Sequence, residues 1–158
     1  MDEKSLSRAI FRRFNEFIVV PAFKMGLGRI ISNPLTGHVM VLKVVGRKTG
    51  KIHYTPVNYA LLGGKFYCYQ GTRLKGQWYL NLMINPKVEM LLHNGRLSGL
   101  AEEVRDPLEK ADAMRQILKS GGIAGFVYGF NPGTATNKLI LEKTGDIPVV
   151  RITPIRNK

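Results

Sequence analysis

A short glycine-bounded segment carries the residues best suited to chemistry. It reads Gly46-Arg47-Lys48-Thr49-Gly50-Lys51, so three cations and a hydroxyl crowd together. Glycine lets a backbone approach a ligand closely, and the exposed amides of a tight turn can receive an oxyanion. The planar guanidinium of arginine adds a fork that matches phosphate. The segment lacks Walker-loop spacing, so it predicts another kind of anion-binding turn; the alternative is a basic hairpin turn that serves only solubility.

The net charge of the chain also points to an acidic partner. Lys and Arg number 24 against 11 Asp and Glu, which gives +13. A field of this size attracts polyanions, and nucleic acid, anionic lipid and a phosphorylated cofactor all qualify. No nucleic-acid-binding motif is recognisable in the sequence, so we expect no nucleic-acid partner.

The elements that must position the turn are short strands joined by hairpins. β-Branched and apolar residues predict strands at 39–45 and 54–62, on either side of the turn. Gly63-Gly64 and Asn94-Gly95 are hairpin turns. Further strands are predicted at 65–70, 87–93, 96–104 and 147–152, a short helix at 78–82, and a longer helix that opens at Asp106-Pro107. This pattern predicts an α+β, mainly antiparallel barrel with one or two helices packed on it.

Residues 1–37 are predicted to form an N-terminal helix and its connector, and residues 38–158 the barrel domain. Apolar side chains recur at helical spacing across residues 3–20, opposite several cations, and Pro21 ends the pattern. We expect this helix to pack on the barrel. The alternative is weak docking on an anionic membrane surface.

What the sequence lacks excludes several classes of protein. Cys68 is the single cysteine, so no intramolecular disulfide can form, and no Cys/His cluster has zinc-ligand spacing. No apolar run approaches the roughly 20 residues that span a bilayer. No basic region leads into an apolar core at the N-terminus. We expect no metal site and a cytoplasmic protein, at most peripheral to a membrane.

The turn also stands in a longer pattern. It is followed by Pro56, by Trp78-Tyr79-Leu80-Asn81-Leu82, by Asn85-Pro86-Lys87-Val88 and by a closing stretch at 144–154. In order and spacing this pattern resembles the deazaflavin-dependent nitroreductase family. The resemblance implies a split β-barrel of the flavin-reductase type that binds coenzyme F-420, an 8-hydroxy-5-deazaflavin, with FMN as the secondary candidate.

The implied function is an oxidoreductase that passes a hydride from the reduced deazaflavin to an apolar, electron-poor acceptor such as a quinone, enone or nitroaromatic. Two alternatives remain open: an FMN-binding protein of the same fold, and a lipid- or membrane-surface-binding module without catalysis. The oligomeric state stays open between monomer and homodimer.

The resemblance places the phosphate and glutamyl tail near the turn, the ring beside residues 53–58, and residues 78–82 over the cofactor. The implied cofactor-binding residues are Arg47, Lys48, Thr49, Gly50, His53, Tyr54, Thr55, Pro56, Val57, Asn58, Gln70, Gly71, Thr72, Trp78, Tyr79, Leu80, Asn81 and Leu82. For Trp78, core packing is the alternative. No catalytic side chain is assigned, because hydride transfer from a reduced deazaflavin needs little acid–base help.

A glycine-rich segment at 121–133 carries the predicted acceptor site. Members of the family place tyrosines before the last strand, and this chain has none between residues 134 and 146. Tyr128 and Phe130 are the predicted replacements, on a loop that closes over a flat acceptor. The alternative is that these aromatics bury themselves against the helix at 107–119.

Overall fold

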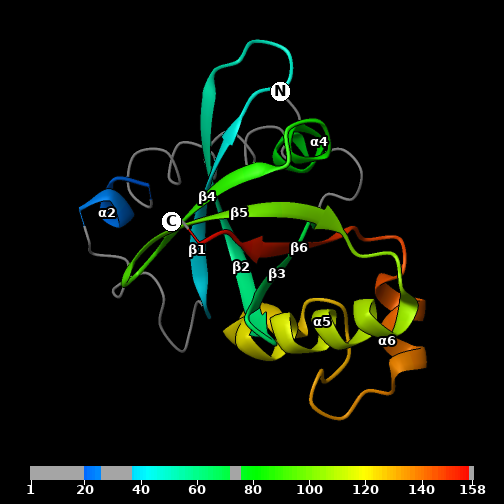
Figure 1. The fold of residues 1–158 in the computed structure, drawn as a ribbon. Coiled ribbons are helices and arrows are strands. Elements are labelled where there is room, and N and C mark those ends of the chain that lie inside the picture. Colours follow the sequence, from blue (N-terminus) through cyan, green and yellow to red (C-terminus); the bar gives the residue numbers. More distant parts are fainter. Residues whose placement is uncertain (1–19, 26–36, 72–75, 157–158) are drawn as a thin grey trace, which may run out of the picture.

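Within the described residues, six antiparallel strands form a closed barrel (Figure 1). The structure is a computed structural model, which describes residues 20–25, 37–71 and 76–156. Around the barrel the strands follow the order β1-β2-β3-β6-β5-β4. Their bounds are β1 Val39–Val45, β2 Ile52–Leu62, β3 Lys65–Tyr69, β4 Lys87–Leu92, β5 Gly95–Glu103 and β6 Val149–Pro154. The predicted mainly antiparallel barrel is confirmed.

Alternation along β1 supplies part of the barrel interior. Met40, Leu42 and Val44 are almost fully buried and join one cluster with side chains from the other strands. On the opposite face, Val41 packs with β4 and with the short helix α2 (Val20–Lys24). Successive side chains of a strand point to opposite faces, so β1 is buried on both sides. This accounts for its nearly unbroken apolar sequence.

Helices close one end of the barrel and cover part of its outside (Figure 1). α4 (Gln77–Ile84) runs from the end of β3 to the start of β4 and places Trp78, Tyr79 and Leu82 in the interior core. α5 (Pro107–Ser120) packs outside on β2, β3 and β6. η3 (Gly122–Phe126) follows α5, and both η3 and α6 (Asn137–Thr144) pack on α5.

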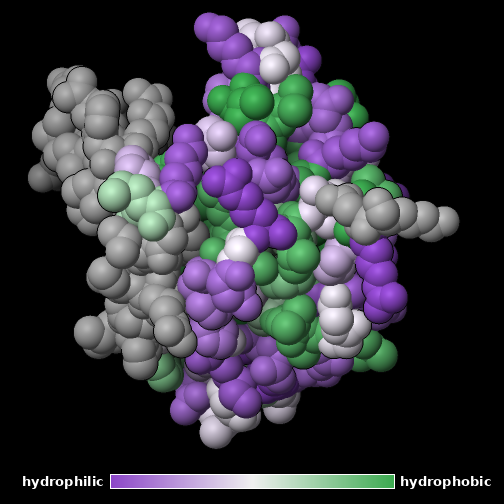
Figure 2. All heavy atoms as spheres, turned by 60° about the vertical axis from the view of Figure 1, so that its left-hand side comes forward, coloured by the Kyte–Doolittle hydropathy of each residue, from purple (hydrophilic) through white to green (hydrophobic). Residues whose placement is uncertain are grey.

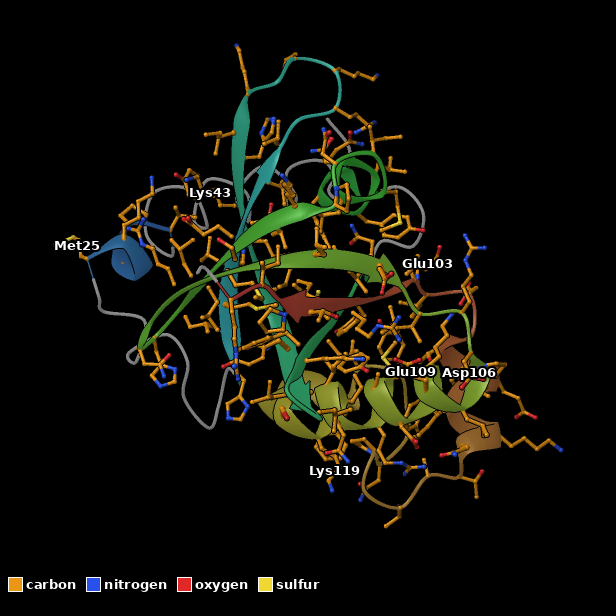
Figure 3. All side chains as sticks on the ribbon, in the orientation of Figure 1. Met25, Lys43, Glu103, Asp106, Glu109 and Lys119 are labelled. Atoms are coloured by element: carbon orange, nitrogen blue, oxygen red, sulfur yellow. The ribbon has the colours of Figure 1, made fainter. Side chains whose placement is uncertain are left out.

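The start of α5 follows from its sequence. The Asp106 side chain accepts a hydrogen bond of 2.8 Å from the N–H of Glu109, and Pro107 occupies the first turn, where its missing N–H costs nothing. An ionic network then ties α5 to the barrel: Glu109 accepts from the Tyr67 hydroxyl at 2.8 Å and from Arg151 at 2.6 Å. Figure 3 shows Asp106 and Glu109 near the start of α5 and Lys119 near its end.

The remaining differences from the predicted elements concern their ends, α6, and η3, which lies in the predicted loop at 121–133. β2 begins at Ile52, and the last strand begins at Val149 because Ile147 instead donates a hydrogen bond to the Thr144 carbonyl after α6. α6 begins after Thr136, whose hydroxyl accepts from the Leu139 N–H. The sequence prediction did not place this helix.

The predicted helix at 3–20 lies outside the described residues except for Val20, which begins α2. Pro21 stands in the first turn of α2, a position that proline tolerates, and does not end a helix there. The division of the chain at residue 37 stays a prediction. Among the described helices, none is long and apolar enough to cross a membrane.

Candidate active site

The predicted cofactor residues gather at one end of the barrel. Antiparallel pairing brings the end of β1, the start of β2, the end of β3 and the start of β6 to this end. α4 lies across it, and the turn at 46–51 rises beside α4 (Figure 1). Segments far apart in the sequence therefore meet around the turn.

Arg47 ties the turn to α4. Its backbone N–H donates to Oδ1 of Asn81 at 3.1 Å, and its guanidinium Nη1 donates to the same oxygen at 2.9 Å. Nη1 also donates to Oε1 of Gln77 at 3.1 Å. Asn81 is only 4% exposed. Arg47 as a cofactor-binding residue stays a prediction, and the sequence analysis did not predict its contact with Asn81, for which an asparagine between two leucines was the available signal.

Hydrogen bonds inside the turn leave specific donors available. The N–H groups of Gly46 and Gly50 donate to the carbonyls of Lys51 and Gly46, and the Lys51 N–H donates to the Thr49 hydroxyl. Gly50 has φ +69°, the left-handed region that favours glycine. In the described part of the chain, the N–H groups of Lys48 and Thr49 have no partner. These two N–H groups are therefore available as hydrogen-bond donors.

The three cations of the turn are not neutralised. Lys48 and Lys51 are exposed, and Arg47 bonds to amide oxygens rather than to carboxylates. Among the residues that the structure describes, no carboxylate forms an ion pair with any of the three. The turn therefore keeps its positive charge.

Among the described residues, the first half of the strand that follows the turn has an open edge. β2 pairs with β1 along residues 52–58, but its pairing with β3 begins only at Tyr59. Tyr59 donates its N–H to the carbonyl of His38 on the β1 side, and alternation then directs the backbone of Tyr54 and Pro56 away from β1. Proline suits such an edge because it has no N–H to leave unpaired. The barrel closes through the second half of β2, while the edge of its first half has no strand partner among the described residues.

Not every predicted cofactor residue faces this opening. Trp78, Tyr79, Leu82 and Val57 are buried in the barrel core, which favours the core-packing alternative for Trp78. Tyr54, Thr55, Pro56, Asn58 and Leu80 are half-buried, and Lys48, Thr49, Gly50, His53 and Gly71 are exposed. Thr72 lies outside the described residues.

Gln70 links the end of β3 to the start of α4. Its side chain is 6% exposed and fills the space beside Gly76, where an added Cβ would lie 1.1 Å from its Nε2. Gly76 therefore has to be a glycine for Gln70 to keep its place. This packing holds α4 close to the strand end.

The predicted acceptor residues pack on the outside of the barrel. Phe130 is 9% exposed and belongs to a core cluster with α5 and β3 residues. Tyr128 is half-buried against the same cluster, and its ring meets that of Tyr69 edge-on at 6.3 Å. This packing favours the alternative that these aromatics bury themselves against α5. Phe126 and Val127, by contrast, are 57% and 68% exposed.

A hollow of about 250 Å³ lies on the outer face of β1, β4 and β5. Its lining includes Val45, Ile52 and Ile155 together with Lys43 and Glu89. Val45 and Ile52 flank the turn, and Figure 2 shows hydrophilic residues at the uppermost tip with hydrophobic ones directly beneath. None of the predicted cofactor residues lines this hollow.

Burial affects the titratable side chains that the structure describes near this end, and it is also the main cause that raises the pKa of Tyr79, with a hydrogen bond to Glu103 adding to it. Burial raises the pKa of the Tyr59 hydroxyl and raises the pKa of the Cys68 thiol to about 12, so neither ionises near neutrality. His53 is exposed and packs against the backbone of Gly46. No group of His, Cys, Asp or Glu in the described ranges could hold a metal ion.

Solved structures share this fold. A putative 5-nitroimidazole antibiotic resistance protein from Bacteroides thetaiotaomicron is 15% identical, with a TM-score of 0.55 over 81% of this chain and 79% of that one. Protein Rv2991 from Mycobacterium tuberculosis is 20% identical, with a TM-score of 0.57 over 77% and 75%. The F420-H2-dependent reductase FDR-A is 21% identical, with a TM-score of 0.53 over 72% and 92%. These likenesses show that the chain shares the split-barrel fold.

A family model gives the narrower assignment. The model for F420H2-dependent quinone reductases matches residues 18–122, which include the turn, β2 and α4. The chain therefore belongs to the F420H2-dependent quinone reductase family, an oxidoreductase family whose cofactor is reduced coenzyme F-420. This confirms the family resemblance and the F-420 cofactor that the sequence predicted. No curated protein matches the chain.

Proposed function

We propose that this protein transfers a hydride from reduced coenzyme F-420 to an apolar, electron-poor acceptor, first of all a quinone, with enones and nitroaromatics as further candidates. Family membership supports the cofactor and the quinone. One structural observation carries the placement of the site: three uncompensated cations are fixed beside α4, next to the open edge of β2. An anionic tail and a flat ring require these two features side by side.

The tail of the cofactor binds at the turn. Its phosphate and carboxylates match the donors left there, which are the ammonium groups of Lys48 and Lys51 and the N–H groups of Lys48 and Thr49. Charge-assisted hydrogen bonds of this kind are about twice as strong as neutral ones. Arg47 adds long-range attraction while its guanidinium stays on α4.

The ring lies along the open edge of β2. The backbone of Tyr54 and the carbonyl of Pro56 face this edge and offer hydrogen bonds to a heterocycle, while Pro56 itself contributes no N–H. Half-buried Thr55 and the adjacent Gln70 and Gly71 form the neighbouring walls. Backbone groups held by a barrel keep a fixed geometry, which is what orientation of a ring requires.

The chain contributes positioning and electrostatics to the reaction. When bound, the reduced deazaflavin supplies the hydride. The residues of the chain hold the tail, align the ring edge and leave one face for the acceptor, which lowers the entropic part of the barrier. No proton step is assigned to a side chain.

Two measurements test the proposal. Fluorescence titrations of the purified protein with coenzyme F-420 and with FMN should show saturable binding of F-420 and weaker or no binding of FMN. Steady-state oxidation of reduced F-420 should then occur with menadione, an enone or a nitroaromatic. Binding of FMN without binding of F-420 would overturn the cofactor assignment. Binding of F-420 without turnover of any of the three acceptors would overturn the acceptor class.

A further inference from the structure

We propose that Asn81 is a positioning residue: its amide fixes Arg47 and the cationic turn against α4 while leaving the charge of Arg47 uncompensated. The inference rests on the proposed function, because an uncompensated charge at this place matters only if the turn receives the anionic tail. Asn81 then acts through Arg47 and does not itself contact the cofactor.

The geometry of the contact supports a positioning role. One buried oxygen of Asn81 accepts both the backbone N–H and the guanidinium of the same residue, at 3.1 and 2.9 Å. The side chain of Arg47 is thereby folded back over its own peptide, so its backbone and its side chain are both held. Gln77 precedes Asn81 by four positions and lies on the same face of α4, where it accepts a second bond from Nη1.

The burial of Asn81 makes this contact costly to break. It is 4% exposed and stands between Leu80 and Leu82 in a helix, where asparagine has poor propensity. A buried amide left without its hydrogen bonds loses their free energy and keeps its desolvation cost. The turn is therefore held in one place even though Lys48, Thr49 and Gly50 are exposed.

The neutral charge of the amide is the second half of the argument. An aspartate at position 81 would accept the same two hydrogen bonds and would bind a guanidinium more strongly. It would also cancel one of three positive charges at the turn. Arg151 shows the other solution in the same molecule, since it bonds to the carboxylates of Glu102 and Glu109. An asparagine combines anchoring with an intact positive field.

Two substitutions separate the anchor from the charge. Asn81→Ala removes the hydrogen bonds and frees the turn, whereas Asn81→Asp keeps the hydrogen bonds and neutralises Arg47. Asn137 provides a matched control. Its Oδ1 accepts a hydrogen bond of 2.7 Å from Nη2 of Arg115, which joins α5 to the start of α6. Asn137→Ala and Asn137→Asp change the same kind of contact away from the turn.

Limited trypsin digestion of the cofactor-free protein tests the anchor without reference to the cofactor. Cleavage after Arg47, Lys48 and Lys51, followed by mass spectrometry, should speed up several-fold in Asn81→Ala and stay at the wild-type rate in Asn81→Asp and both Asn137 variants. An unchanged cleavage rate in a folded Asn81→Ala protein would overturn the positioning role, whether or not F-420 binds.

Cofactor titrations and kinetics test the charge. Asn81→Ala and Asn81→Asp should each weaken F-420 binding roughly ten-fold, with the KM for reduced F-420 raised and kcat little changed. The defect of Asn81→Asp should shrink as salt is added, because salt screens the lost attraction. Wild-type affinity in Asn81→Asp would overturn the charge argument. Absence of F-420 binding in the wild type would instead refute the proposed function, and the digestion result would stand separately.

Discussion

Two arginine-centred networks join helices to this barrel, and their net charges have opposite signs. At one end Arg47 bonds to the amides of Asn81 and Gln77 on α4. On the outer side Arg151 of β6 bonds to Glu109 of α5 at 2.6 Å and to Glu102 of β5 at 2.9 Å. The first network keeps its positive charge, whereas the second more than cancels it.

The difference shows that the excess charge of +13 is not compensated evenly over the molecule. Where a helix only has to be held, as at α5, the protein pairs the arginine with carboxylates, which is the stronger contact. At the turn, which we propose as the site for an anionic tail, neutral amides hold the arginine. A positive charge on the surface is informative when the structure leaves it unpaired, and less so when carboxylates surround it.

The largest expected effect concerns the unpaired end. The double substitution Lys48→Ala with Lys51→Ala removes two ammonium groups that face solvent, so F-420 affinity should fall roughly a hundred-fold or more in a fluorescence titration. The melting temperature should hardly move, because neither side chain makes an ion pair among the described residues.

A matched pair of lysines controls for net charge. Lys119→Ala with Lys138→Ala removes two exposed cations on α5 and α6, away from the turn. If this second double variant lost as much affinity as the first, the overall charge of the protein would explain binding and the turn would have no special role.

The paired side should show the converse behaviour. Arg151→Met removes two charge-assisted hydrogen bonds and, among the described residues, leaves the Glu109 carboxylate with Tyr67 as its partner. The free energy of unfolding should therefore fall by about 2 kcal/mol, and Tm by roughly 4–8 °C. F-420 affinity should remain within about two-fold of the wild type. A large loss of affinity at unchanged Tm would erase the distinction between the two networks.

A smaller effect should follow pH. Burial opposes the ionisation of Glu109, but hydrogen bonds from Tyr67 and Arg151 outweigh it and hold its pKa below its ordinary value. The unfolded chain therefore takes up the proton first, and the stabilisation by Glu109 is complete at neutral pH and is lost on acidification below about pH 5. The stability gap between wild type and Glu109→Gln should narrow over that range in chemical denaturation. A gap that widens on acidification would contradict this reading.

Local patterns made much of this molecule predictable. Gly63-Gly64 and Asn94-Gly95 predicted the hairpins, and Gly63, Gly64 and Gly95 have positive φ. Asp106-Pro107 marked the start of α5. The turn at 46–51 was found because its residues are adjacent in sequence. For the same reason the strand at 39–45 was predicted with its observed bounds.

Contacts between distant residues were not predictable in the same way. Arg47 and Asn81 are 34 positions apart, and only the closure of α4 over the barrel end brings them together. Tyr128 and Phe130 share an aromatic, glycine-rich loop, a composition that fits either a lid or a packed segment. The packing of Phe130 with α5 depends on long-range contacts that its neighbours in sequence do not encode.

The smallest expected effect concerns Cys68, whose thiol should react very slowly in the native protein. Its side chain is fully buried in β3, and burial raises its pKa to about 12, so almost no thiolate is present at neutral pH. Iodoacetamide should therefore label the native protein only through opening of the barrel, and denaturant should restore rapid labelling. Because a ligand that binds the native state lowers the population of open forms, saturating F-420 should slow labelling further, in proportion to its concentration over Kd. Free coenzyme mixed with Lys48→Ala, Lys51→Ala protein should give no such protection. Rapid labelling of the wild type, unaffected by F-420, would show that the barrel opens locally at β3, two residues from Gln70, and that the site end is not the rigid frame that positioning of a ring requires.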